Sequence, residues 1–397
     1  MNRTFFCCRL AVALCLLGVS NAQAQTVFDN GAVNTVTTPL ADVLVSNATT
    51  VDFQAGSAAQ APAMANAITA VSVSGDSVIL LNGGTIRGGD DSVGGGEAGA
   101  GIGGVDTAVI VNDGNVRGGD NNNVLGTGGV GIRLRPVASA CSLEVNGGVI
   151  VGGNAQIDFS AGAGIVSDRC NTLVTMGSIS GGNGIGGIAD GSVGLDAGGP
   201  LVSTQISGGT FSGGLNADGT RATAVAIDGP VQVTGGTFIG GSPASGGVSR
   251  FPLFFIDESQ GEISGGIFQP AVGAVALRIS EAPGFTVSGG EFPPGALWSL
   301  DEGSIVTVVG SGLTNTLNPG GDGGTVVGRL ADGSPIDIVY TVVEMSEVLV
   351  RNIDPPPGSA GEARIEPIPL GQAWTMLVLS AGLCGLSLRA LRRRWSR

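Results

Sequence analysis

The stretch Ile206-Ser207-Gly208-Gly209-Thr210-Phe211 decides the fold, because variants of it recur along the chain. Each copy places a bulky apolar residue directly after a pair of residues that begins with glycine. These bulky residues are Ile86, Val116, Ile150, Ile179, Phe211, Phe238, Phe268 and Phe292. They lie 30, 34, 29, 32, 27, 30 and 24 residues apart. A repeat of this length indicates a solenoid, a propeller or another array.

Each repeat is rich in residues that favour strands, and the runs Leu143–Val145, Val231–Val233 and Phe285–Val287 precede the glycines. A second apolar run stands upstream in most repeats, as in Thr107–Val111, Ala224–Ile227, Leu253–Ile256 and Val275–Ile279. No repeat carries the long amphipathic pattern of a crossover helix. A four-stranded propeller blade needs about 40 residues, which is more than this repeat supplies. The sequence therefore predicts an all-β fold, a right-handed parallel β-helix of roughly ten coils.

Stacked coils would place the bulky residues in one inward ladder, aliphatic from Ile86 to Ile179 and aromatic from Phe211 to Phe292. The Phe ladder is interpreted as core, and a sugar-stacking platform is the alternative. Cys141 and Cys170 both stand nine residues before a bulky residue, so they hold the same position in adjacent coils. Neighbouring rungs lie about 4.8 Å apart, which a disulfide accepts. We predict a Cys141–Cys170 bridge, with two buried free thiols as the alternative.

Composition limits the chemistry. The 397 residues include 72 glycines, no histidine and no lysine, so the usual general base and any Schiff-base lysine are missing. Residues 25–370 carry 11 arginines against 32 acidic residues, a net charge of −21. Such a surface repels nucleic acid and anionic lipid. Its carboxylates could take up Ca²⁺, but we expect no tightly bound cofactor and no built metal site.

The N-terminal segment has the features of a secretory signal. Residues 1–24 combine early arginines, an apolar run and the small residues Ala22 and Ala24 before the expected cleavage point. We expect residues 25–62 to form an N-terminal cap and residues 63–313 the β-helix repeats. Residues 314–353 would form a C-terminal β cap with a hairpin turn at Asp332-Gly333. Residues 354–367 form a proline-rich linker.

The last 30 residues carry a second signal. Ile368-Pro369 and Trp374 precede an apolar stretch at 371–388, and Arg392, Arg393 and Arg394 follow it. Eighteen helical residues span about 27 Å, enough for a transmembrane helix with its arginines in the cytoplasm. This tail resembles the IPTL-type relatives of the PEP-CTERM sorting signals of Gram-negative bacteria, although Leu370-Gly371 and Thr375 depart from the commonest form.

The resemblance implies cleavage by an exosortase-type membrane protease and delivery to the cell surface or extracellular matrix. The inner membrane would hold only the precursor, transiently, through the C-terminal helix. A plain C-terminal membrane anchor is the alternative interpretation of the same residues.

The body resembles right-handed parallel β-helix, pectin-lyase-like surface proteins, some of which are polysaccharide lyases or hydrolases that build sites from carboxylates and basic residues on one face. The matching candidates here are Asp228, Asp257, Glu258 and Glu281 with Arg278. These acids are not in one strict register, and acids at strand ends are usually solvated. Arg87-Gly88-Gly89-Asp90 recurs as Arg117-Gly118-Gly119-Asp120 and predicts a surface ion-pair network, with ligand binding as the alternative.

These features favour an exported, non-enzymatic, adhesin-like or structural protein of the cell surface or matrix, with a long lateral face for polysaccharide or matrix. The second hypothesis is a secreted β-helix polysaccharide lyase or glycoside hydrolase. An autotransporter passenger is excluded, because about 60 residues after Leu313 cannot supply the many strands of a membrane barrel.

Overall fold

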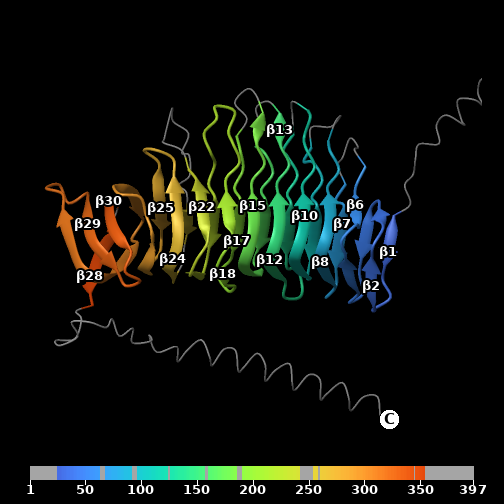
Figure 1. The fold of residues 1–397 in the computed structure, drawn as a ribbon, viewed down its shortest axis with the longest axis horizontal. Helices are drawn as coiled ribbons and strands as arrows, with labels where there is room; N and C mark the ends of the chain where they lie inside the picture. The colour runs from blue at the N-terminus through green and yellow to red at the C-terminus, as the bar shows by residue number, and fades with distance from the viewer. Residues whose placement is uncertain are drawn as a thin grey trace, which may run out of the picture. The chain divides into compact units, whose positions relative to one another are not determined.

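The chain forms a solenoid-like stack of mostly parallel strands (Figure 1). The computed structural model describes residues 25–62, 68–91, 96–123, 126–156, 160–185, 190–241, 254–257, 260–343 and 345–353. Every regular element within these ranges is a β-strand. The all-β, solenoid-like part of the prediction is therefore confirmed.

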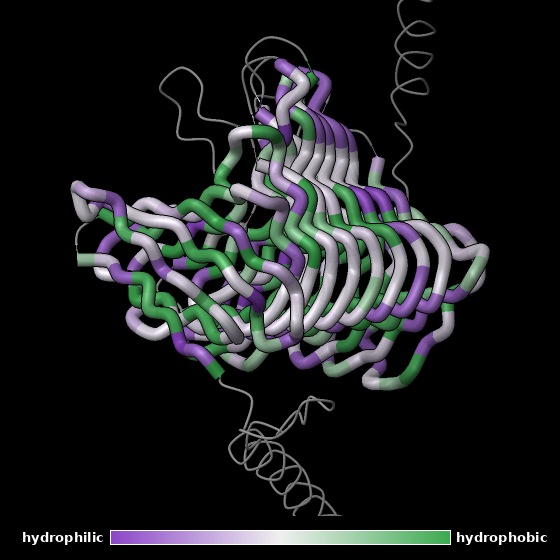
Figure 2. Tube along the Cα trace, turned by 60° about the vertical axis from the view of Figure 1, so that its left-hand side comes forward, coloured by the Kyte–Doolittle hydropathy of each residue, from purple (hydrophilic) through white to green (hydrophobic). Residues whose placement is uncertain are grey.

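Two long ladders of parallel strands run side by side through the stack, and each coil contributes to both (Figure 2). The first ladder consists of β1 (Thr26–Phe28), β4 (Val43–Val45), β7 (Val71–Ser74), β9 (Ile102–Val105), β11 (Ile132–Arg135), β14 (Ile165–Asp168), β17 (Leu195–Gly198), β20 (Val225–Asp228), β23 (Phe254–Asp257), β25 (Val275–Ser280), β27 (Ala296–Asp301) and β30 (Pro335–Val342). Each strand pairs in parallel with the corresponding strand one coil later.

The second ladder begins with β2 and ends with β31. It consists of β2 (Val33–Val36), β5 (Thr50–Phe53), β8 (Val78–Arg87), β10 (Ala108–Arg117), β12 (Ser142–Val151), β15 (Asn171–Ser180), β18 (Thr204–Ile206) with β19 (Thr210–Ser212), β21 (Val231–Val233) with β22 (Thr237–Gly240), β24 (Gln260–Pro270), β26 (Gly284–Glu291), β28 (Ile305–Leu317) and β31 (Glu347–Asn352). Two shorter parallel pairs accompany it: β3 (Pro39–Leu40) with β6 (Ala58–Gln60), and β13 (Ala155–Gln156) with β16 (Gly184–Ile185).

The glycine pairs mark a bend inside the strands of the second ladder. The register between β8 and β10 shifts on either side of Asp113, and Gly114 there has φ +104°. The same bend recurs five coils later in β24 at Gly266, which has φ +108°. L-residues with a side chain rarely adopt this left-handed region, so glycine is required where the strand turns toward its second half.

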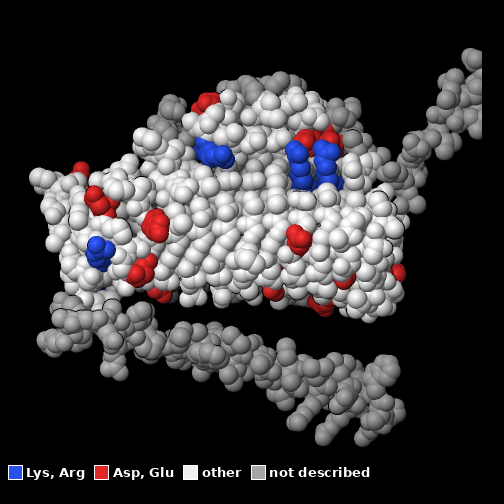
Figure 3. Space-filling view, in the orientation of Figure 1, with Lys and Arg blue, Asp and Glu red and all other residues white. Residues whose placement is uncertain are grey.

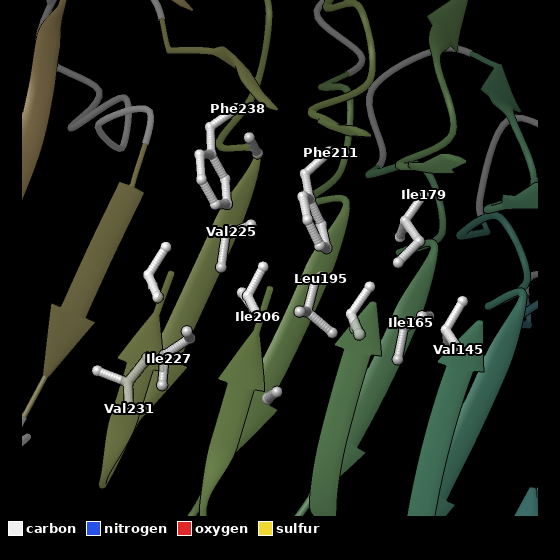
Figure 4. Packing of buried hydrophobic residues seen from close by; sticks show 14 of the residues in the cluster. Val145, Ile165, Ile179, Leu195, Ile206, Phe211, Val225, Ile227, Val231 and Phe238 are labelled. Carbon is white, nitrogen blue, oxygen red and sulfur yellow. The ribbon is translucent and has the colours of Figure 1, made fainter. Parts of the chain in front are cut away.

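The bulky residues of the repeat form one inward ladder, as the register predicted. Ile86, Val116, Ile150, Ile179, Phe211, Phe238 and Phe268 are paired rung by rung. All of these side chains are buried, and they belong to a core that runs through the whole stack. Figure 4 shows Phe211 and Phe238 lying against each other on successive coils. The aromatic ladder is therefore core rather than an exposed stacking platform.

The phenylalanine rings stack face to face along the stack. The centroids of Phe211 and Phe238 are 5.2 Å apart, those of Phe238 and Phe268 4.9 Å, and those of Phe268 and Phe292 4.5 Å. Trp298 meets the edge of Phe292 at 5.1 Å. Each such pair contributes about 0.5–1.5 kcal/mol beyond the burial of its area, so the ladder adds both stability and register.

A disulfide joins Cys141 and Cys170 across two adjacent coils. Their Cα atoms are 4.8 Å apart, the distance of one rung. Both residues are buried. They stand just before β12 and β15, whose residues Ser142 and Asn171 are register partners.

The ends of the stack differ from the expected boundaries. β1 to β6 already pair in parallel with later coils, so the stack begins at Thr26 and residues 25–62 belong to it. Near the C-terminal end of the described residues, β29 (Gly323–Leu330) runs antiparallel between β28 and β30. The chain then returns to the parallel stack in β30 and β31, so half of the expected β cap continues the coils.

Contacts divide the chain into residues 1–353 and residues 354–397. The signal peptide, the linker, the sorting motif and the expected transmembrane helix lie outside the described residues. Within the described ranges, no helix is long and apolar enough to cross a bilayer. Among the described residues, the buried hydrophobic core extends from Val36 to Val348.

Candidate functional site

An acidic row lies along one end of the first ladder. It consists of Asp168, Asp228, Asp257 and Asp301, which end β14, β20, β23 and β27. Asp228 and Asp257 are register partners in adjacent coils, so the structure brings together two of the predicted residues. The next residue in the same register is Ser280, followed by Asp301. The acids are therefore closer to a single register than the sequence indicated.

Asp196 in β17 also lies near this row. It precedes Gly198 by two residues, and Gly198 is the register partner of both Asp168 and Asp228. The Asp196 side chain is exposed, but neighbouring protein atoms exclude part of the water around its carboxyl group. This desolvation raises the pKa of Asp196. The charges of Asp168 and Asp228 raise the same pKa further.

The pKa of Asp228 is also raised. Desolvation is the main cause, and the negative charges of Asp257 and Asp168 add to it. Like charges on neighbouring rungs disfavour simultaneous ionisation, so a proton is held more tightly here than on an isolated aspartate. A carboxyl group of this kind could act as a general acid, which is the property that hydrolysis of a glycoside needs.

Arg278 is engaged by another acid. Its Nε donates to Asp301 Oδ2 at 2.5 Å, and the two residues form an ion pair. In the register of the first ladder, Arg278 lies between Phe255 and Ser299 and is therefore offset from Asp257. Glu258 lies outside the described residues. Glu281 directly follows Ser280, which occupies the row's register in its coil, and has φ +51°.

Sequence reasoning missed Asp168, Asp196 and Asp301 as neighbours of this row. The repeated pattern of an apolar strand that ends in aspartate, seen in Ile165–Asp168 and Val225–Asp228, could have indicated the first. Asp196 has no counterpart in the strands on either side. Within the described ranges, no group of three or more acidic or cysteine side chains is placed to hold a metal ion.

The Arg-Gly-Gly-Asp repeats form the predicted surface network. Arg87 Nη2 lies 2.9 Å from Asp90 and 3.1 Å from Asp120, and Arg117 Nη2 lies 2.7 Å from Asp120. The aspartates also accept main-chain hydrogen bonds from the next coil, as when Asp90 accepts from the N–H of Asp120 at 2.8 Å. The network thus relieves the like charges that stacking brings together, and it ties coils to one another.

The bend line of the second ladder carries polar side chains in the N-terminal coils. Asn82 donates to Asp52 at 2.8 Å, Asn112 to Asn82 at 2.7 Å and Asn146 to Asn112 at 3.0 Å. Thr175 continues this ladder with a 2.8 Å bond to Asn146. The amides therefore satisfy one another along the stack rather than facing solvent as independent donors.

In the C-terminal coils a groove lies beside the glycine pairs of this bend. The groove has a volume of about 410 Å³. We call it the glycine groove, and it is lined by Gly208, Gly209, Gly235, Gly236, Thr237, Gly266, Ile267, Gly290, Glu291, Asp332 and Ser334. Its floor is main chain: a Cβ on Gly235 would lie 2.4 Å from the Ser207 carbonyl oxygen.

One end of the glycine groove is closed by the turn between β29 and β30. Asp332 Oδ2 accepts the N–H of Gly290 at 2.9 Å, and its Oδ1 accepts the N–H of Ser334 at 2.8 Å. Asp332 therefore holds the turn against a coil that is 42 residues away. Thr237, Ile267 and Glu291 stand in one register along the groove.

In the view of Figure 3 most of the lateral face is free of charged side chains, and basic and acidic groups gather in small clusters. Comparison with protein-family models, curated proteins and solved structures gives no match to this chain.

Proposed function

We propose that this chain is an exported, non-enzymatic protein of the cell surface or extracellular matrix of a Gram-negative bacterium. Its body would be a right-handed parallel β-helix of the pectin-lyase-like kind. A signal peptide cleaved after Ala24 would export it, and an exosortase-type protease would process the C-terminal signal. In this role the rod acts as an adhesin-like or structural element.

The observation that carries the proposal is the glycine groove on a rigid stack. A core that runs through every coil, the Cys141–Cys170 bridge and the Arg–Asp network hold the lateral face in one shape. A groove with a main-chain floor fits an extended polysaccharide laid along the coils. Disulfide formation also agrees with an oxidising, exported location.

The ligand of the groove would be a neutral polysaccharide. A net charge of −21 over residues 25–370 disfavours an anionic polymer at long range. The exposed carboxylates of Glu291 and Asp332 can accept hydrogen bonds from sugar hydroxyls. Thr237 and Ile267 supply a hydroxyl and an apolar surface between them.

A groove-filling substitution tests the binding role. Thr237→Trp places a large ring in the glycine groove and should abolish retention of a neutral glycan on a panel, with no shortened product released. Ser178→Trp is the matched control, because Ser178 occupies the same register two coils earlier, outside the groove. Equal retention by both variants would refute the groove as the binding face.

The sorting proposal is tested separately by mass spectrometry of the C-terminal peptide from membrane, shed-surface and medium fractions. A chain that ends near Ile368 outside the inner membrane is expected. Variants at Trp374 or Ile368-Pro369 should accumulate as unprocessed precursor. An intact chain that ends at Arg397 in the inner membrane would refute sorting and leave a plain membrane anchor.

A second candidate function, a secreted polysaccharide lyase or glycoside hydrolase, is favoured by one observation. Asp228 has a raised pKa and lies one rung from Asp257, which supplies the paired carboxylates that glycoside hydrolysis uses. Release of unsaturated or shortened oligosaccharides, lost in Asp257→Ala, would support it. Absence of any product across the panel would reject this candidate.

A further inference from the structure

The bends of the second ladder share one position at which side chains are rare. This bend position lies three residues before each bulky residue of the repeat. It is occupied by Gly83, Asp113, Gly147, Met176, Gly208, Gly235, Gly265 and Gly289. Among these residues, Asp113 and Met176 alone carry a side chain.

Close approach of the main chains requires glycine at the bend position in the C-terminal coils. A Cβ on Gly208 would lie 2.1 Å from the Thr175 carbonyl oxygen, and a Cβ on Gly265 would lie 2.3 Å from that of Thr234. Both distances are too short for a real Cβ atom. The floor of the glycine groove can therefore accept no side chain along this line unless the main chain shifts.

Met176 stands directly before this floor. Ser178, two residues after Met176, is the register partner of Thr210, two residues after Gly208. Met176 therefore lies beside Gly208, one rung away, and its carbonyl oxygen is 3.4 Å from a Cβ built on Gly209. The Met176 side chain is 61% exposed. A flexible thioether chain thus stands on the surface where the glycine floor begins.

The extent of the groove agrees with an end at Met176. The lining begins at Gly208-Gly209 and continues to Gly290. Gly147-Gly148 would continue the line of glycines beyond Met176, yet neither residue belongs to the lining. A glycine pair at the bend is therefore not sufficient to extend the groove, and the lining stops on the C-terminal side of Met176.

The opposite end of the floor is closed by Asp332, whose Oδ2 holds the turn between β29 and β30 against Gly290 at 2.9 Å. Gly208 and Gly290 belong to the coils of Phe211 and Phe292, which are three rungs apart. At about 4.8 Å per rung, the floor between the two ends is about 14 Å long. The groove is therefore bounded along the axis of the stack.

We propose that Met176 sets the length of neutral polysaccharide that the glycine groove holds. This inference rests on the glycan-binding role proposed above. A pyranose ring in a chain is about as long as one rung, so the four coils of the floor take about four rings. A longer chain must rise off the surface at Met176, and the rings beyond it add no contact. Met176 is thus a specificity-determining residue for ligand length.

Isothermal titration calorimetry of the exported protein with cello- and malto-oligosaccharides of increasing length tests the proposal. Wild-type affinity should rise up to about four rings and then stay constant. Met176→Gly opens the floor toward Gly147-Gly148, so affinity should rise over about two further rings and exceed the wild-type value about tenfold for the longest ligands. Met176→Leu keeps an apolar side chain of similar volume and should retain the wild-type limit.

Asp113→Gly is the matched control, because it places glycine at the same bend position two coils before Met176, away from the groove. It should leave the length limit unchanged. Met176→Ala shortens the same side chain without adding a glycine, so it should also lengthen the preferred ligand if Met176→Gly fails to fold.

The outcomes separate this inference from the proposed function. Suppose that Thr237→Trp abolishes binding but that wild type, Met176→Gly and Met176→Ala share one length limit: the role of Met176 is then overturned, and the groove remains the glycan site. A wild-type affinity that keeps rising with ligand length overturns that role as well. Binding that Thr237→Trp leaves intact, or no binding of any oligosaccharide, refutes the groove as the glycan site and the length limit with it.

Discussion

The Cys141–Cys170 disulfide should stabilise the stack by a measurable and calculable amount. The bond closes a loop with a sequence separation of 29 residues. The chain-entropy relation for such a loop gives an entropy loss of about 12 cal/mol/K in the unfolded chain, which is about 3.6 kcal/mol at 25 °C. We expect reduction of the native protein to lower the free energy of unfolding by about this amount.

Two perturbations separate the cross-link from the packing of its sulfur atoms. Dithiothreitol breaks the bond but leaves both side chains in place, whereas Cys141→Ala/Cys170→Ala also removes two buried sulfurs. The double variant should therefore be destabilised slightly more than the reduced wild type, because a small cavity adds to the lost constraint. Serine is avoided, since it would bury a hydroxyl.

Urea unfolding followed by far-UV circular dichroism measures the difference. The reduced and substituted chains should show a lower midpoint and a larger dependence of the free energy on urea, because the unfolded chain is less compact. A change of less than about 1 kcal/mol on reduction would contradict the loop argument. Alkylation of both thiols in unreduced, exported protein would refute the bridge itself.

Three further predictions concern named side chains. Phe238→Leu keeps an apolar side chain but removes stacking on Phe211 and Phe268, so it should cost about 1–3 kcal/mol, against about 3–5 kcal/mol for Phe238→Ala; equal costs by urea unfolding would argue that stacking contributes nothing. The raised pKa of Asp228 means that its ionisation costs native stability as pH rises above 3.8 through the raised value. Asp228→Asn should therefore raise the Tm at pH 7 and leave it unchanged below pH 3.8, and a Tm lowered at neutral pH would contradict this. The Asp106 carboxylate accepts main-chain N–H bonds from Val137, Ala138 and Ser139, which lower its pKa, so its stabilisation is present above pH 3.8 and is lost as pH falls through the lowered value. Asp106→Asn should lower the Tm at pH 7 with a gap that closes in acid, and a gap that persists at pH 2 would show that the charge is not responsible.

Much of the architecture could be predicted because a stacked repeat turns sequence spacing into spatial adjacency. Residues that hold the same place in successive copies become neighbours about 4.8 Å apart, so Ile86 to Phe268 form one ladder and Cys141 meets Cys170. The Arg87 and Arg117 networks follow from the same rule. Each of these contacts could be predicted from the alignment of the repeats and the distance between neighbouring coils.

The candidate sites depended on contacts that no repeat pattern contains. The bulky residues of the repeat lie 24 to 34 residues apart, so the alignment of acids such as Asp196 and Asp301 is uncertain until the coils are stacked. Asp332 reaches Gly290 only because β29 folds back against an earlier coil, and that contact closes the glycine groove.

The sequence alone determined the all-β class, the repeat register, the aromatic core and the position of the cysteines, because each depends on periodicity. Tertiary structure decided where the stack begins, that β29 folds back between β28 and β30, and that a groove lies beside Asp332. These features depend on which strands pair and on contacts between residues far apart in the chain. Both are properties of the assembled stack.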